Sequence, residues 1–280
     1  MTPPRSHRVL VPLVSLAIAA ASAGCGAAHR RGGEQGKGLL VAEDLYARGM
    51  GELQRHHLAK AKSLLEGVQF NAQNRPALEP LVRLALADVL FYTGDSISLI
   101  DARSKYVEFV TLYGDHPRAA YAQFQAGICS LKQISSPARD QSQTRAAIAD
   151  FEDVEKRYPD SVYSAPARGM IELTEVHLAE HEYLVGRYYV KRHAYFSAAE
   201  RFRGILANYS RYAEKQKVYL ELGRALILAK NRVEGTIYLD KLVADYPRDA
   251  HAAEARKLLA SLSGGSPAGD AAKGAGPNQR

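Results

Sequence analysis

The chain has 280 residues, of which 46% are hydrophobic and 24% charged, so its composition is that of a globular protein with a sizeable core. A net charge of +7 and a pI near 9.3 are compatible with nucleic acid or anionic surfaces as partners. The basic residues are interspersed with Asp and Glu along expected helical faces. We therefore interpret the charge as a solvated surface and expect no nucleic-acid binding.

The first 24 residues are typical of an export signal. Arg5 and Arg8 form a short basic region, and an apolar run follows over residues 9–21. This run is too short to span a bilayer. We therefore predict that residues 1–24 are a signal peptide.

The signal ends in a motif that resembles the lipobox of bacterial lipoproteins. Residues 23–26 read Ala-Gly-Cys-Gly, and Cys25 is the thiol that would be acylated, with Ser22 where the motif usually has Leu. Several acyl chains give stable membrane anchoring. Gly26 is not the Asp that retains many such lipoproteins in the inner membrane, so the resemblance implies the outer membrane. Cleavage after Ala23, which fits an A-x-A site, is the alternative interpretation.

Two segments flank the expected folded region. Residues 25–38 are rich in Gly and lack an apolar period, so we expect a flexible tether, and residues 263–280 have the composition of a disordered tail. The folded domain is therefore predicted to span residues 39–262. Cys129 is the one thiol inside it, and we expect it to be a core residue.

The folded region is predicted to be all-α, because no run in it alternates with period two between turns. Residues 147–161 show the unit most clearly. Ala147, Phe151 and Val154 lie on one stripe of a helix, and Pro159 ends that helix. An apolar stripe of this kind requires a partner helix.

A fixed spacing recurs along the chain: a small residue, a second one twelve positions later, and a large apolar residue four positions after that. The instances are Gly49, Ala61 and Leu65; Gly186, Ala198 and Phe202; Gly223, Gly235 and Leu239. Small residues let two helix backbones approach, and the larger residue fills the space beside them. This pattern resembles the tetratricopeptide repeat.

Five copies of this repeat are predicted. Their second helices are expected near residues 57–70, 99–113, 144–158, 195–209 and 233–246. Residues 135–142 are expected to form an inserted loop, residues 163–191 one long helix, and residues 250–262 a helix that caps the stack. The predicted architecture is a tetratricopeptide-like helical solenoid of about five pairs with a C-terminal capping helix.

The long helix contains the sequence His177-Leu-Ala-Glu180-His181, a literal H-x-x-E-H. One class of zinc metalloproteases uses this pattern to place two ligands on one helical turn. That chemistry also needs a third ligand within a larger domain that contains strands, so we interpret the motif as a polar helix face. We expect no enzymatic activity, no metal and no cofactor; a zinc metalloprotease is the alternative of a different class. The apolar residues of this helix are expected to pack against neighbouring helices: Met170, Leu173, Val176, Leu184 and Val185.

Aromatic and basic residues gather at the end of the long helix. Tyr188 lies beside Arg187 and close to Arg192. Aromatic grooves bind extended peptides, and the cations can meet acidic groups of a partner. The alternatives are that the tyrosines are packed and that the cations interact with the helix dipole.

The export signal, the repeats and two segments together resemble the BamD family, the repeat lipoproteins of the β-barrel assembly machinery. The segments are RDQSQTRAAIADFEDVEKRYPDS and YLVGRYYVKRHAYFSAAERF, and the resemblance covers most of residues 40–250. It implies a non-enzymatic scaffold, anchored by a lipid on Cys25 at the periplasmic face of the outer membrane. The first two repeats diverge from the family most.

The resemblance also implies the partners. The C-terminal repeats would hold the periplasmic POTRA region of a BamA-like barrel protein within a complex of further lipoproteins. The N-terminal repeats would receive unfolded outer-membrane proteins. Arg201 matches an arginine that contacts BamA in that family, and Arg187, Tyr188 and Arg192 are the further partner-binding candidates. Another repeat lipoprotein scaffold, which organises peptidoglycan enzymes or pilus assembly, is the alternative.

Overall fold

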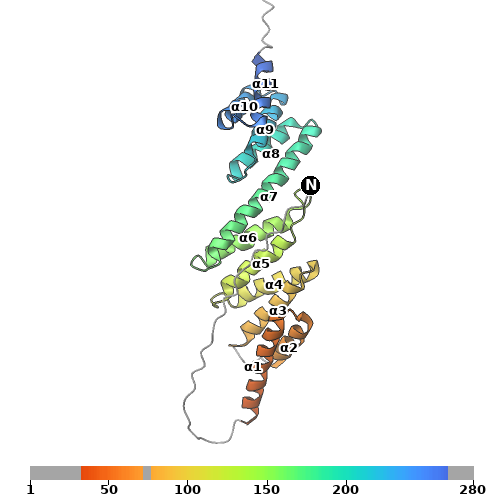
Figure 1. The fold of residues 1–280 in the computed structure, drawn as a ribbon, viewed down its shortest axis with the longest axis vertical. Helices are drawn as coiled ribbons and strands as arrows, with labels where there is room; N and C mark the ends of the chain where they lie inside the picture. The colour runs from red at the N-terminus through yellow and green to blue at the C-terminus, as the bar shows by residue number, and fades with distance from the viewer. Residues whose placement is uncertain (1–32, 72–76, 264–280) are drawn as a thin grey trace, which may run out of the picture.

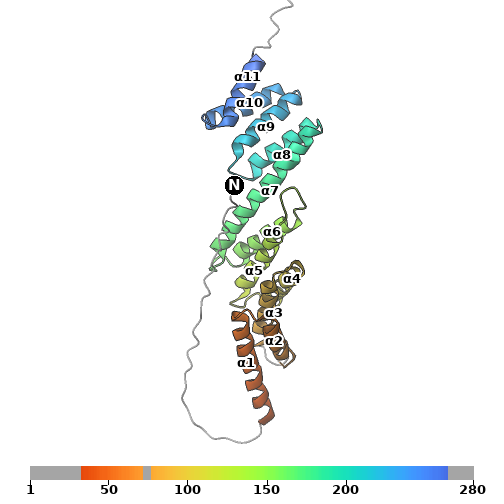
Figure 2. The same ribbon diagram turned by 45° about the vertical axis from the view of Figure 1, so that its right-hand side comes forward.

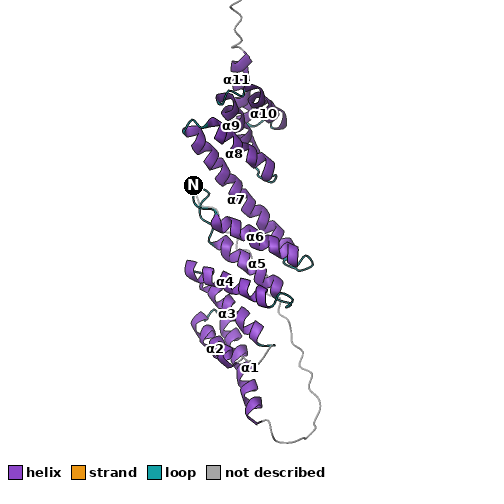
Figure 3. Ribbon diagram, turned by 180° about the vertical axis from the view of Figure 1, so that it is seen from behind, coloured by secondary structure: helices purple, strands orange, loops and turns teal. Residues whose placement is uncertain are grey.

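The computed structural model describes residues 33–71 and 77–263, and within these ranges every regular element is a helix (Figures 1 and 3). The helices are α1 Gly33–Gln54, α2 Leu58–Asn71, α3 Glu79–Thr93, α4 Ser96–Leu112, α5 Ala119–Lys132, α6 Ser142–Arg157, α7 Ser164–Lys191, α8 Tyr195–Asn208, α9 Lys215–Leu228, α10 Arg232–Asp245 and α11 Ala250–Ser263. The all-α prediction is confirmed. The five predicted second helices are α2, α4, α6, α8 and α10, and α7 is the predicted long helix.

The helices stack in chain order into an elongated solenoid, from α1 at one end to α11 at the other (Figures 1 and 2). Apart from α1 with α3 and α9 with α11, every substantial contact joins two helices that are neighbours in the sequence. None of the described helices combines the length and the apolar character that crossing a bilayer requires.

Four of the helix pairs cross at a glycine of the first helix. A Cβ atom added at the crossing glycine would lie 2.5 to 2.9 Å from a side chain of the second helix, closer than real Cβ contacts allow. The pairs are Gly49 with Leu65, Gly127 with Phe151, Gly186 with Phe202, and Gly223 with Leu239. The predicted role of the spacing is therefore confirmed, and Gly127 adds a crossing that the spacing search did not name.

The turn between α3 and α4 shows how the sequence separates two helices. Gly94 adopts φ 77°, a left-handed conformation that closes α3, and its N–H donates to the carbonyl of Leu90. The carboxylate of Asp95 then accepts bonds from the N–H groups of Ile97 and Ser98, both 3.0 Å long. The first turn of α4 is thus capped by a side chain.

The core consists of a series of apolar clusters, each built from about three successive helices. Phe124, Phe151 and Ile171 share one cluster, in which α7 packs against α5 and α6. The next cluster begins at Ala179 and includes Phe202, so the second half of α7 packs against α8 and α9. Helix α7 therefore connects the two halves of the solenoid (Figure 2).

Helix α1 begins earlier than the sequence predicted. Helix α1 starts at Gly33, so residues 33–38 are helical, whereas a flexible tether was expected there. Helix propagation from the packed part of α1 costs little per residue, which lets the helix continue through a stretch without an apolar stripe. Cys25 and the predicted signal peptide lie outside the described residues.

Candidate functional site

The partner-binding candidates lie on the last turns of α7 and the first half of α8, and a tight helix crossing fixes their positions. Phe202 is fully buried, and its ring contacts the backbone at Gly186. The ring of Tyr183 packs on it with a centroid distance of 5.7 Å. This packing sets the rotation of α7 and thereby the direction in which its polar side chains point.

Arg201 lies on the α8 side of this surface. Its Nη1 donates to Glu182 on α7 at 2.9 Å, and the bond to this carboxylate raises the pKa of Arg201. The Arg201 side chain is still 45% exposed. An exposed ion pair of this kind contributes about 0–1 kcal/mol, so a carboxylate from outside can replace Glu182 at little cost.

Arg187 lies on the side of this surface away from Arg201, and its side chain points toward α9. Its Nη1 donates to the hydroxyl of Tyr183 at 3.3 Å and lies 3.7 Å from the carboxylate of Glu221. The hydroxyl bond and then the charge of Glu221 raise the pKa of Arg187. Arg187 therefore joins α7 to α9, a role that its position in the sequence did not indicate.

Tyr188 and Arg192 lie on the face between these two flanks, since successive helical residues turn by about 100°. Tyr188 is 57% exposed, with its ring edge-on to Tyr189 at 5.9 Å. Arg192 is exposed and has no ion-pair partner among the residues that the structure describes. The structure thus places Tyr188 and Arg192 together and sets Arg187 and Arg201 on either side of them.

The exposed face of α7 is also apolar. Leu184, one turn before Tyr188, is 37% exposed, and Leu173 and Val176 on the first half of the helix are 60% and 37% exposed. The prediction of packing against other helices was wrong for Leu173, Val176 and Leu184, whereas Met170 does pack against the cluster with α5 and α6. Helices α6 and α8 contact other sides of α7, and the sequence pattern does not tell a covered stripe from an uncovered one.

The H-x-x-E-H motif is engaged in contacts within the chain. His177 donates from Nε2 to the carbonyl of Ser135 at 2.9 Å, and His181 donates from Nδ1 to the carbonyl of Pro137 at 2.6 Å. Glu180 accepts hydrogen bonds from Tyr212, in the loop before α9, and from Lys217 on α9.

The electrostatics of the motif agree with these contacts. Burial acts to raise the pKa of Glu180, but the bonds from Tyr212 and Lys217 outweigh it and lower the pKa. Within the described ranges, no three His, Cys, Asp or Glu side chains are grouped as a metal site would require.

A buried carboxylate lies in the N-terminal half. Asp88 on α3 accepts hydrogen bonds from the hydroxyls of Tyr106 at 2.6 Å and Tyr121 at 2.8 Å. Burial raises the pKa of Asp88 to about 6, against the lowering effect of the two hydroxyls and of Arg118. Asp88 joins α3, α4 and α5, and nothing in the sequence pattern distinguished it from a surface carboxylate.

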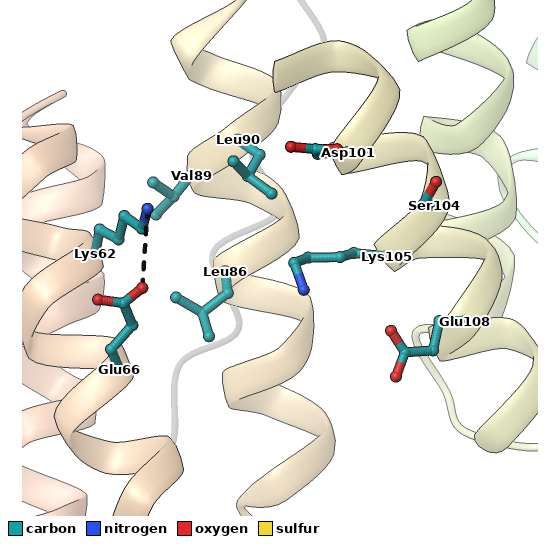
Figure 4. Close-up of a pocket in the computed structure, with 9 residues that line it drawn as sticks. All are labelled: Lys62, Glu66, Leu86, Val89, Leu90, Asp101, Ser104, Lys105 and Glu108. Carbon is teal, nitrogen blue, oxygen red and sulfur yellow. Dashed lines mark ion pairs between the residues drawn. The ribbon is translucent and has the colours of Figure 1, made fainter. Parts of the chain in front are cut away.

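A groove of about 420 Å³ crosses the same half between α2 and α4, with α3 as its floor (Figure 4). The floor is apolar and consists of Leu86, Val89 and Leu90. The walls are charged: Lys62 and Glu66 form an ion pair along α2, and Lys105 extends over the floor from α4. Lys105 has no ion-pair partner within the part of the chain that the structure describes.

These features define the class of the protein: a tetratricopeptide-type helical solenoid that presents an aromatic and basic face on α7. The chain belongs to the YfiO family of outer membrane lipoproteins, because the model of that family matches residues 40–235.

Two proteins with sequences similar to this chain are each named outer membrane protein assembly factor BamD. The chain is 27% identical over 258 residues to the outer membrane protein assembly factor BamD of Caulobacter vibrioides, which covers 90% of this chain and 81% of the relative. It is 30% identical over 194 residues to BamD of Neisseria gonorrhoeae, with 64% and 70% covered. Among solved structures, the TPR2AB-domain:pHSP90-complex of yeast Sti1 is similar with a TM-score of 0.41 and 13% identity, over 80% of this chain and 86% of that one.

Proposed function

We propose that this protein is a non-enzymatic scaffold of the outer-membrane β-barrel assembly machinery. The observation that carries the proposal is the family match over residues 40–235, and relatives along most of this span are named outer membrane protein assembly factors. In this proposal the protein is held at the periplasmic face of the outer membrane by a lipid on Cys25. In this proposal the protein acts by binding its partners and catalyses no reaction.

The proposed contact with a BamA-like barrel protein uses the α7–α8 surface. Tyr188 and Leu184 offer apolar area, and Arg201 can exchange Glu182 for a carboxylate of the partner's POTRA region. Tyr and Arg are the residue types that most often dominate the binding free energy of an interface. Arg192 supplies a further charge on this face, and the accessory lipoproteins of the complex would bind elsewhere on the solenoid.

The proposed contact with unfolded outer-membrane proteins uses the N-terminal half. An extended chain with alternating apolar and polar side chains can place its apolar residues on the floor formed by Leu86, Val89 and Leu90. Its polar residues would then face Lys62 and Lys105 on the walls. This mode requires an extended segment whose apolar side chains are exposed, as they are in an unfolded protein.

Capture from detergent-solubilised envelope tests the α7–α8 contact. The intact protein is expected to recover a BamA-like barrel, and Arg201→Glu is expected to reduce that recovery about tenfold or more. Arg168→Glu is the matched control, because Arg168, on the N-terminal half of α7, forms an exposed ion pair with Glu155 of α6. Recovery of only cell-wall hydrolases or pilus subunits would instead favour a different repeat lipoprotein scaffold.

The lipid anchor has its own test. Cys25→Ala is expected to release the protein from the membrane fraction when the barrel partner is depleted. A variant that stays membrane-bound under those conditions would contradict the anchor assignment. Mass spectrometry of the mature N-terminus then separates acylation at Cys25 from cleavage after Ala23.

A further inference from the structure

The middle of α7 lies between the two apolar clusters that this helix joins, and Thr174 is the one residue of 172–178 that is buried. Ile171 is the last residue of α7 in the cluster with α5 and α6, and Ala179 is the first in the cluster with α8 and α9. Between them, Leu173 is 60% exposed, and the hydroxyl of Thr174 donates back to the carbonyl of Met170 at 2.6 Å. Such back-bonding tends to bend helices. We call residues 172–178 the waist, because here only one helix joins the two halves (Figure 2).

The inserted loop between α5 and α6, residues 133–141, is ordered by its own last residue. Gln141 is 2% exposed, and its side-chain amide donates to the carbonyls of Ser136 at 3.2 Å and Arg139 at 2.9 Å. Its Oε1 accepts from the hydroxyl of Thr144 at 2.8 Å. The loop is therefore tied into α6, on the N-terminal side of the waist.

The loop is also bonded to α7 at and beyond the waist. His177 and His181 donate to the carbonyls of Ser135 and Pro137, as described above. The histidines therefore bond to carbonyls of this loop that Gln141 does not bond. One turn of helix separates the two histidines, so they hold the loop at two points and resist its rotation.

A second connection crosses the waist in the opposite direction. Arg211, in the loop between α8 and α9, forms an ion pair with Glu172, the first residue of the waist. The N-terminal half therefore reaches forward through residues 133–141, and the C-terminal half reaches back through Arg211. No substantial contact joins α6 directly to α8.

We propose that the loop of residues 133–141, held by His177 and His181, is a brace that sets the angle between the two halves of the solenoid. The H-x-x-E-H sequence is in this view a structural device. His177 and His181 hold the brace, while Glu180 ties the same turn of α7 to α9. The brace keeps the groove over α3 and the α7–α8 surface at a fixed separation; this consequence for binding rests on the proposed function.

The test removes the two donors and then restores them. In the full chain with Cys25→Ala, spin labels at Lys62 on α2 and Lys241 on α10, both about half exposed, report the distance between the halves. His177→Ala with His181→Ala is expected to broaden the distance distribution. His177→Gln with His181→Asn keeps donors near the Nε2 and Nδ1 positions and is expected to restore the narrow one.

Amide exchange gives a second readout on unlabelled protein. Loss of two hydrogen bonds is expected to lower the protection of amides in residues 133–141 about 5- to 30-fold. Exchange in α2 and α10 should be unchanged, which shows that the variant is folded. An unchanged distance distribution in the double-alanine variant would overturn the proposal, as would failure of the Gln and Asn pair to restore it. Partner capture does not enter either measurement, so failure of the proposed function would be seen separately.

Discussion

The ring of Phe202 occupies the space in which a side chain at residue 186 would lie: a Cβ on Gly186 would be 2.5 Å from its Cε1 atom. Gly186→Ala is therefore expected to push α8 away from α7 and to reduce the free energy of unfolding by about 1–3 kcal/mol. Gly169→Ala on the same helix is the matched control, since no heavy atom lies within 4 Å of its added Cβ. That control should be stabilised by roughly 0.5–1 kcal/mol, because Ala favours the helix interior. Denaturant unfolding of both variants checks this, and equal effects would contradict the close approach.

Asp88→Asn is expected to change how stability depends on pH. Folding raises the pKa of Asp88 from 3.8 to about 6, so the unfolded chain loses this proton first as the pH rises. Below about pH 4 the carboxyl of Asp88 is protonated in both states and does not lower the free energy of unfolding. Between about pH 4 and 6 it lowers this free energy progressively, and above about pH 6 the loss reaches up to about 3 kcal/mol. Asn cannot ionise and keeps an acceptor for Tyr106 and Tyr121.

The gain in unfolding free energy from Asp88→Asn should therefore be larger at pH 7.5 than at pH 4. Denaturant titrations of the parent and the variant at both values measure this difference directly, because all other groups are shared. A gain that is the same at the two values would show that Asp88 titrates in the folded protein as it does in the unfolded chain.

Arg103→Ala is expected to destabilise the junction between α4 and α6. Arg103 donates two hydrogen bonds, of 2.7 and 2.9 Å, to the carboxylate of Asp150, whose side chain is 7% exposed. Burial raises the pKa of Asp150, and Arg103 acts to lower it. Removal of Arg103 therefore leaves the buried carboxylate of Asp150 without its positively charged partner. The expected loss is about 1.5–3 kcal/mol at neutral pH.

The geometry of this pair allows a finer control. Arg103→Lys keeps the charge but cannot make the two parallel bonds, so it should recover only part of the loss. Arg103→Ala combined with Asp150→Asn should be less destabilised than Arg103→Ala alone, because no buried charge remains. Full stability of Arg103→Lys would show that the charge alone matters.

Glu180→Gln tests the two interpretations of the motif on α7. If Glu180 is a link to α9, the substitution weakens the bonds to Tyr212 and Lys217 and lowers the unfolding free energy by about 1–2 kcal/mol. A chelator should leave the melting temperature of the parent unchanged. Bound zinc in the purified protein, together with a chelator-sensitive melting temperature, would favour a metal site instead.

The sequence allowed the helix pairs to be predicted because their spacing is local. Gly186, Ala198 and Phe202 meet at one crossing whose positions follow from helix geometry alone, and Tyr-Pro steps such as Tyr158-Pro159 mark where second helices end. The start of α1 was missed because residues 33–38 carry no apolar stripe, and a helix that propagates from a packed segment needs none.

The roles of individual polar residues could not be predicted, because their partners are distant in the sequence. His181 bonds to Pro137, and Arg103 bonds to Asp150; in each case more than forty residues separate the two. Leu173 was expected in the core because an apolar stripe looks the same whether or not another helix covers it. Arg201 was placed only through the family resemblance, and its pair with Glu182 became visible only in three dimensions.

The contacts between successive helices have a consequence for how the chain reaches this structure. Since almost every substantial contact joins neighbouring helices, no long segment has to close into a loop before native contacts form. Chains with such local contacts fold quickly, and structure can nucleate in any pair and spread along the stack. The N-terminal pairs can therefore assemble before the residues of α8 to α11 have been synthesised, and folding can keep pace with the growth of the chain.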